Sequence, residues 1–408
     1  MANISNPAFN DPAIDASRLL ARLGYVVLAV GAPCSEALSS RAIFLFFPIG
    51  VVLLLTASLL DPAPGFAARV KWAVLSPLAW TALGLLGWAA VSLAWTPFPT
   101  EGVQHWLKLA GTILAAFMVI ASAREHMRAA DLYMIPIGVL IAMIAILLLA
   151  IARRAQLGLD LPDQEHSGVA LVALLFPAMG CLAARGRNGL ARLLMILALA
   201  FTFAIGAPAT AAALLVGFTV LSFAISDAER TVFDVGIAAA ALIVLAPLIP
   251  ALAPTFAHWF AQAELTKLAE PFPPLAVAAD VVFQNPARLL TGHGLDAANK
   301  GMEAGLLPPR VPRVILFEIW YELGIIGAAL GAAAAWFGFQ ALGRAGDKVA
   351  PYLVAAFAAD LSLGFLVQDF SQMWWVNLLA VSAISGAAAV RSQYRTQRPI
   401  AFGPSPHL

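Results

Sequence analysis

Long apolar runs with few charged residues follow one another through most of this sequence, from about residue 20 to about residue 390. A run of roughly 20 such residues is long enough to cross the hydrocarbon core of a membrane as a helix. Hydrophobic residues make up 61% of the 408 residues, whereas charged residues make up only 12%. Because soluble domains are about 45–50% apolar and about 25% charged, this chain has too little polar surface for a water-soluble globule. We therefore predict a polytopic membrane protein.

The apolar runs predict an all-α protein with about 12 transmembrane helices, because they are continuous rather than alternating. The predicted helices cover residues 20–36, 42–60, 73–95, 104–122, 131–152, 167–184, 190–206, 208–226, 231–251, 316–341, 350–368 and 371–390. Residues 1–251 then hold helices 1–9, residues 252–315 form one long loop, and residues 316–408 hold helices 10–12 and a tail. We expect these parts to form one integral membrane domain.

Basic residues set the expected orientation, because cytoplasmic loops carry an excess of Lys and Arg. With the N-terminus inside, the inside segments contain fifteen such residues. The short outside loops contain three, which are Arg41, Arg153 and Arg154. Both termini are therefore predicted to be cytoplasmic, and residues 252–315 to be extracytoplasmic.

The long loop is too apolar to be disordered. Phe256, Trp259, Phe260 and Ala263 recur at the spacing i, i+3, i+4, i+7, which is typical of an amphipathic helix at a membrane interface. We predict a helical cap that contacts membrane lipids on the outer face.

Ionisable residues on the outer side are functional candidates. The basic ones could converge on a diphosphate, whose oxygens a guanidinium binds bidentately; they are Arg153, Arg154, Arg288, Arg310 and Arg313. A nearby His or Glu could accept a proton from an attacking hydroxyl, and the catalytic candidates are His293 and Glu318. His166 and Glu322 are expected to bind substrate together with the arginines. Further outer ionisable residues are Asp160, Asp163, Glu165, His258, Lys267, Glu270, Asp280, Asp296, Lys300, Glu303 and Asp369.

Several of these candidates also have a structural interpretation. Arg153 and Arg154 could anchor a helix end among lipid headgroups. Arg288 could close a turn, and His166 could lie at a helix start. Glu318 and Glu322, four residues apart on one helical face, could pair with loop arginines.

Motifs for the common cofactors are missing from the sequence. No Walker motif, no GxGxxG segment after a strand and no HExxH segment occurs, so we expect no cofactor and no catalytic metal. The net charge of +1 gives no basis for a nucleic-acid partner.

Four segments resemble the O-antigen ligase/O-antigen polymerase superfamily of bacterial membrane glycosyltransferases. They are residues 31–39 (GAPCSEALS), 91–97 (VSLAWTP) with the helix that follows, 285–295 (NPARLLTGHGL) and 317–327 (FEIWYELGIIG). The last is the most specific, because it resembles the start of the family's tenth helix. The predicted topology also resembles that of the family, with twelve helices, both termini inside and one long outer loop.

The resemblance implies a metal-independent, inverting enzyme of the bacterial inner membrane. Such an enzyme transfers a glycan from an undecaprenyl-diphosphate donor to a glycan or lipid-core acceptor, in surface polysaccharide or lipopolysaccharide synthesis. The family's usual loop His-Asn pair is replaced here by Arg313 and Val314, and its Ser-Arg pair after the seventh helix by residues 209–211 (ATA). The base is then expected to be His293, Glu318 or His166, with His293 ranked first, unless the reaction is changed or lost.

Two other functions remain open. A transporter or flippase of lipid-linked oligosaccharides would be expected to show inverted repeats, and the single asymmetric loop favours the enzyme. A non-catalytic partner in a polysaccharide assembly complex is the third hypothesis.

Overall fold

The computed structural model describes residues 12–36, 39, 41–62, 65–123, 129–154, 164–249, 272–308, 311–346 and 348–391. Helices and turns account for the regular structure of these residues, and no strand occurs among them. The first half contains α1 (Pro12–Val26), the π-helical turn η2 (Val27–Gly31), α2 (Ala32–Glu36), α3 (Ile43–Leu60), α4 (Phe66–Val74), α5 (Pro77–Ser92), α6 (Pro99–Ser122) and α7 (Ala129–Arg154).

The second half continues the helical pattern. It contains α8 (Gln164–Ala184), α9 (Asn188–Ile205), α10 (Pro208–Ser226), α11 (Ala228–Leu245), the 3-10 turn η3 (Ala246–Leu248), α14 (Phe272–Phe283), α15 (Arg288–Thr291), α16 (Ala297–Glu303), α17 (Ile315–Gly343), α18 (Ala350–Leu366) and α19 (Met373–Arg391).

Every predicted span coincides with helical structure, but the predicted number of spans is not confirmed. In the described part of the chain, eight helices are long and apolar enough to cross a membrane, or nine if the bent pair α4–α5 is one span. Helices α9 and α18 are shorter apolar helices. The first predicted span is divided among α1, η2 and α2. The all-helical class is confirmed.

The third predicted span, residues 73–95, is not one continuous helix. It falls on α4 and α5, whose axes are bent by 66°. Ser76 ends one helix and starts the next, because its Oγ accepts a hydrogen bond from Ala79 N at 3.2 Å and Pro77 occupies the first helical position. A serine followed by proline is a typical helix start.

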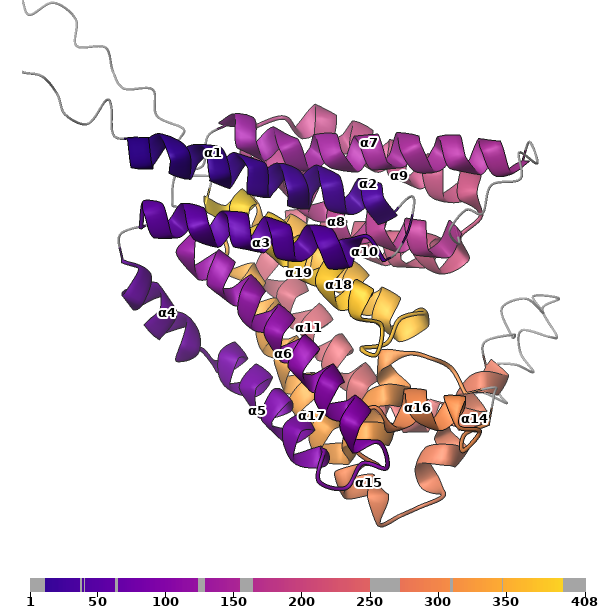
Figure 1. Ribbon diagram of the computed structural model, residues 1–408. Helices are drawn as coiled ribbons and strands as arrows, with labels where there is room; N and C mark the ends of the chain where they lie inside the picture. The colour runs from indigo at the N-terminus through magenta and orange to yellow at the C-terminus, as the bar shows by residue number, and fades with distance from the viewer. Residues whose placement is uncertain are drawn as a thin grey trace, which may run out of the picture.

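Helix α8 lies in the upper part of the bundle in Figure 1, where other helices enclose it. All residues from 167 to 184 are buried, and α7, α9, α10, α18 and α19 pack against this helix. A helix that is apolar on every side is suited to such an enclosed position.

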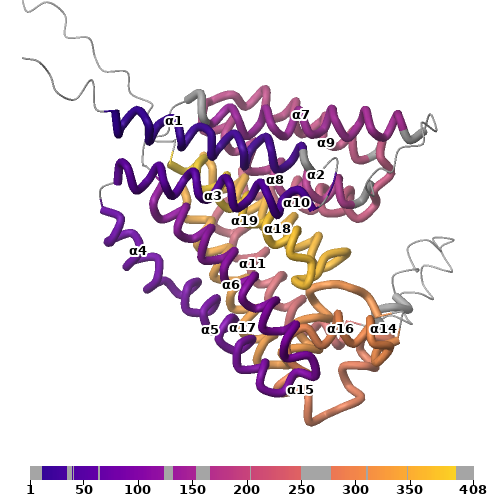
Figure 2. Tube along the Cα trace, in the orientation of Figure 1, coloured from indigo at the N-terminus to yellow at the C-terminus, as the bar shows by residue number. Residues whose placement is uncertain are grey.

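The described part of the predicted long loop is helical. The short helices α14, α15 and α16 gather at one end of the bundle, next to the start of α17 (Figures 1 and 2). Helix α5, distant in sequence, packs along α17. The predicted amphipathic helix at residues 256–263 lies outside the described residues, so the full loop is not confirmed.

Candidate functional site

Helix α17 is broken within its first third. Gly324 has φ 65° and ψ −161°, which are not helical angles. Carbonyls next to the break accept hydrogen bonds from outside the helix. These bonds join Tyr321 O to His293 N at 2.8 Å, Glu322 O to Gly294 N at 2.9 Å, and Leu323 O to Trp88 Nε1 at 2.9 Å.

Gly292 and Gly324 allow the backbone of residues 290–294 to contact the backbone of α17 at this break. A Cβ atom on Gly292 would lie 2.1 Å from Glu322 O, and one on Gly324 would lie 2.6 Å from Leu290 O. Any larger residue would therefore separate the two segments. The resemblance grouped residues 285–295 and 317–327 as separate motifs, and the structure packs them together.

His293 lies between Gly292 and Gly294 in the sequence and faces Tyr321. Its ring stacks on the Tyr321 ring with centroids 4.1 Å apart, and its Nδ1 is 3.0 Å from Tyr321 O. Because a carbonyl oxygen only accepts, Nδ1 carries the hydrogen and Nε2 has the lone pair in the neutral ring. Burial lowers the pKa of His293, partly opposed by the Tyr321 hydrogen bond, and the Arg288 charge lowers it further. The neutral ring thus presents Nε2 as a proton acceptor.

Glu318 lines a polar pocket at the start of α17. The pocket holds about 210 Å³ of empty space, part of it open to solvent. Its polar lining consists of Asn299 from α16, Arg313 and Glu318 around the start of α17, and Asp369 and Ser371 from the turn before α19. Glu318 Oε2 accepts a hydrogen bond from Phe370 N at 2.6 Å. Arg313 is exposed and adds the positive charge of the lining.

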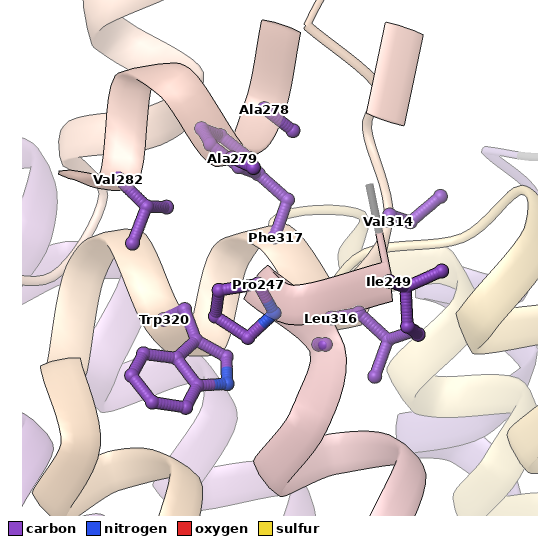
Figure 3. Close-up of a pocket in the computed structure, with 10 residues that line it drawn as sticks. Pro247, Ile249, Ala278, Ala279, Val282, Val314, Leu316, Phe317 and Trp320 are labelled. Carbon is purple, nitrogen blue, oxygen red and sulfur yellow. The ribbon is translucent and has the colours of Figure 1, made fainter. Parts of the chain in front are cut away.

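An apolar pocket adjoins the polar one. It holds about 370 Å³ of empty space, again partly open to solvent, and Figure 3 shows its lining. Pro247, Val282 and Trp320 are among the lining residues. Val314 and Phe317 line both pockets, so the two pockets share a wall.

A buried polar network lies behind the polar pocket. Glu322 is 1% exposed, and its Oε1 accepts a hydrogen bond from Ala298 N at 2.9 Å. His105 from α6 places Nε2 at 2.9 Å from Phe370 O and Nδ1 at 3.6 Å from Asp296 Oδ1. In the part of the chain that the structure describes, no cluster of three or more His, Cys, Asp or Glu is placed to hold a metal ion.

The structure thus divides the predicted site residues. Glu318 and Arg313 line one pocket. Arg288 and His293 line neither the polar nor the apolar pocket, and they lie within electrostatic range of each other. His166 packs against Trp374 at the start of α19 in a tilted arrangement, with ring centroids 4.8 Å apart. Arg153 and Arg154 end α7, but their side chains lie outside the described residues, and so does Arg310.

The sequence interpretation missed His105. A histidine inside a predicted span is a functional candidate, and this rule was the available signal. The residues that His105 contacts are far along the chain, so no spacing pattern connects them.

No protein-family model matches this chain, and no curated protein matches it significantly. Its long apolar helices are typical of multi-pass membrane proteins. The resemblance to the O-antigen ligase superfamily stays a prediction.

Proposed function

We propose that this chain is a membrane glycosyltransferase of surface polysaccharide assembly. It transfers or polymerises a glycan from an undecaprenyl-diphosphate donor at the outer face of the bacterial inner membrane, and both of its termini are cytoplasmic. The observation that carries this proposal is the polar pocket that shares Val314 and Phe317 with an apolar pocket. The chemistry of the two linings matches the two ends of such a donor, an apolar prenyl chain and a charged head.

The arginines supply the charge that a diphosphate leaving group needs. Arg313 lines the polar pocket, and Arg288 lies beside His293. Guanidinium groups bind phosphate oxygens bidentately and stabilise the charge that develops as the bond breaks. Arg153, Arg154 and Arg310 remain further candidates for the same role.

The transfer step requires a proton acceptor. The acceptor hydroxyl oxygen attacks the anomeric carbon, the bond from that carbon to the diphosphate breaks, and undecaprenyl diphosphate leaves. The hydroxyl proton passes to His293 Nε2, whose lone pair is set by the Nδ1 contact with Tyr321 O, or to the Glu318 carboxylate. His293 is our first choice, because burial and the Arg288 charge lower its pKa and so keep its ring neutral and able to accept a proton.

A transporter is the competing membrane function, and the break in α17 is relevant to it. Transporters use unwound helices whose backbone groups bind the substrate or ion. Here the carbonyls of Tyr321, Glu322 and Leu323 are occupied by donors from the protein itself. This favours a structural role for the break and favours the enzyme.

The test is glycan transfer by purified protein in vesicles with a lipid-linked oligosaccharide donor. We expect Arg313→Ala and Arg288→Ala each to lower the rate by about 10²–10³, the usual value of one electrostatic contact in the transition state. Lys at either position should restore part of the rate, since it keeps the charge without the bidentate fork. The matched control is Arg344→Ala, at the exposed opposite end of α17. Full activity of both Ala variants would remove these arginines from the site, and an inactive parent chain would favour the non-catalytic partner.

A further inference from the structure

The polar pocket has walls from separate parts of the chain. One wall is the first turn of α16, with Ala298 and Asn299, and the other is the turn before α19, with Asp369 and Ser371. Between them lies Glu318 of α17. The separation of the two walls sets how the groups on them are aligned with a substrate held against Glu318.

The turn before α19 is held at several points. Its Gln368 O accepts a hydrogen bond from Ile315 N at 3.0 Å, and its Phe370 N donates to Glu318 at 2.6 Å. A further backbone contact is made by Phe370 O, which lies 2.9 Å from His105 Nε2. His105 therefore donates to the turn that carries Asp369 and Ser371.

His105 also contacts the opposite wall. Its Nδ1 lies 3.6 Å from Asp296 Oδ1, and Asp296 directly precedes α16. Both side chains are buried, at 7% and 4% exposure. Because Nε2 donates its hydrogen to the Phe370 carbonyl, a neutral His105 ring has a lone pair on Nδ1. A favourable contact with the Asp296 carboxylate therefore requires a second proton, carried either by Nδ1 or by the carboxyl group. Glu322 is the nearby acid, and it bonds Ala298 N of the same turn.

Asp296 has an unusual backbone conformation. Its φ is 66°, and among the described residues it is the one non-glycine with positive φ. Such angles persist where the surrounding structure over-determines them, and they cluster at functional sites. The Asp296 carboxylate is thus held toward His105 at a cost in backbone strain.

We propose that His105 and Asp296 are a positioning pair that sets the separation of the two walls of the polar pocket. His105 comes from α6 and does not line the pocket, so it acts through Phe370 and Asp296. The consequence for catalysis rests on the proposed function. Loss of the pair should lower kcat for glycan transfer by about 10-fold to 10²-fold, because small misplacements of reacting groups are that costly. The KM for the donor should change little, since the arginines and the apolar pocket are not altered.

The first experiment measures the pocket wall without reference to activity. Ser371→Cys is introduced into a chain whose two cysteines are replaced (Cys34→Ser and Cys181→Ala), and its rate of reaction with a thiol reagent is measured in detergent. We expect His105→Ala to raise this rate several-fold, because the turn loses its contact at Phe370 O. His105→Gln should restore the slower rate, since its amide reaches Phe370 O as Nε2 does. A second reporter, Ser226→Cys at the exposed last position of α10, should react equally in all variants.

Asp296→Asn tests the contribution of the Asp296 charge to the positioning pair. Asn tolerates a left-handed backbone angle and keeps the side-chain shape, so only the charge that faces His105 is lost. We expect faster Ser371→Cys labelling and a lower kcat, with little change in KM. If His105→Ala fails to fold, His105→Asn replaces it, because Asn loses the reach to Phe370 O.

The outcomes separate the two proposals. Unchanged labelling at position 371 in the His105 and Asp296 variants would overturn the positioning pair. Changed labelling together with an inactive parent chain would support the pair and contradict the glycosyltransferase. A raised KM with normal kcat would also contradict the pair, because it would place His105 in donor binding.

Discussion

Glu318 and Glu322 show what burial does to two carboxyl groups on one helical face. Each accepts a hydrogen bond from a backbone N–H, at 2.6 Å from Phe370 and 2.9 Å from Ala298. A buried carboxylate needs such partners, because burial without them is costly. Glu318 lines the polar pocket, whereas Glu322 is 1% exposed and does not. Glu318 is itself only 6% exposed, but it is the one of the two that lines a pocket, whereas Glu322 has a structural role through Ala298 N. Its predicted contact with substrate stays a prediction.

His293 should give glycan transfer a dependence on pH. A base must be neutral, so activity should fall as the pH is lowered through the pKa of His293. Burial and the Arg288 charge lower this pKa from its ordinary value of 6.5. The loss of kcat should therefore lie below about pH 6.5. Arg288→Gln removes the positive charge, so it should move the midpoint of this loss to higher pH.

The measurement is kcat against pH for the parent, Arg288→Gln and His293→Gln. Arg344→Gln is the control and should leave the midpoint unchanged. His293→Gln should lower kcat by about 10²–10⁴, the usual contribution of a general base. If His293→Gln is fully active, His293 is not the base, and Glu318 becomes the candidate for that role.

At the scale of single elements, the broken α17 gives the sharpest stability prediction. Gly324→Ala should destabilise the protein by about 2 kcal/mol or more, because alanine strongly disfavours these backbone angles and its Cβ would lie 2.6 Å from Leu290 O. The control is Gly87→Ala in α5, where a new Cβ meets nothing within 4 Å. Thermal unfolding in detergent compares the two, and equal midpoints would show that the break tolerates a side chain.

The sequence predicted the helices well because apolar runs of this length have few alternatives. Whether a break within a helix could be predicted depended on how strong its local sequence signal is. The bend at Ser76-Pro77 was readable from the residues themselves. The break at Gly324 was not, because a lone glycine also fits inside a helix and only residues 290–294 make the break favourable.

The candidate site was predictable only where its residues lie in or beside a recognisable sequence segment. Glu318 and Arg313 were selected because they lie in or beside a recognisable segment, and the structure places both at one pocket. The link of His105 to Asp296 and Phe370 is purely tertiary. Sequence spacing has no information on such contacts.

Across the whole molecule, α6 connects two chemically different ends. Near its start, His105 contacts the network behind the polar pocket. At its other end, Arg69 Nε donates to Ala121 O at 3.0 Å, and Arg391 donates to Ala123 O. Cations at the C-terminus of a helix complement its dipole. Arg69 and Arg391 belong to the residues predicted to be cytoplasmic, so the pocket end should face outward.

This orientation can be measured in intact cells. In a chain with Cys34 and Cys181 replaced, we expect Gln284→Cys, exposed just after α14, to react with an impermeant thiol reagent in intact spheroplasts. Ser226→Cys, exposed at the end of α10, should react only after lysis. The reason is the excess of basic residues on the Ser226 side, which is retained in the cytoplasm. Labelling of Ser226→Cys before lysis, with Gln284→Cys protected, would show that the orientation is opposite to the predicted one. The pocket would then face the cytoplasm, and an outer-face transfer reaction would be impossible.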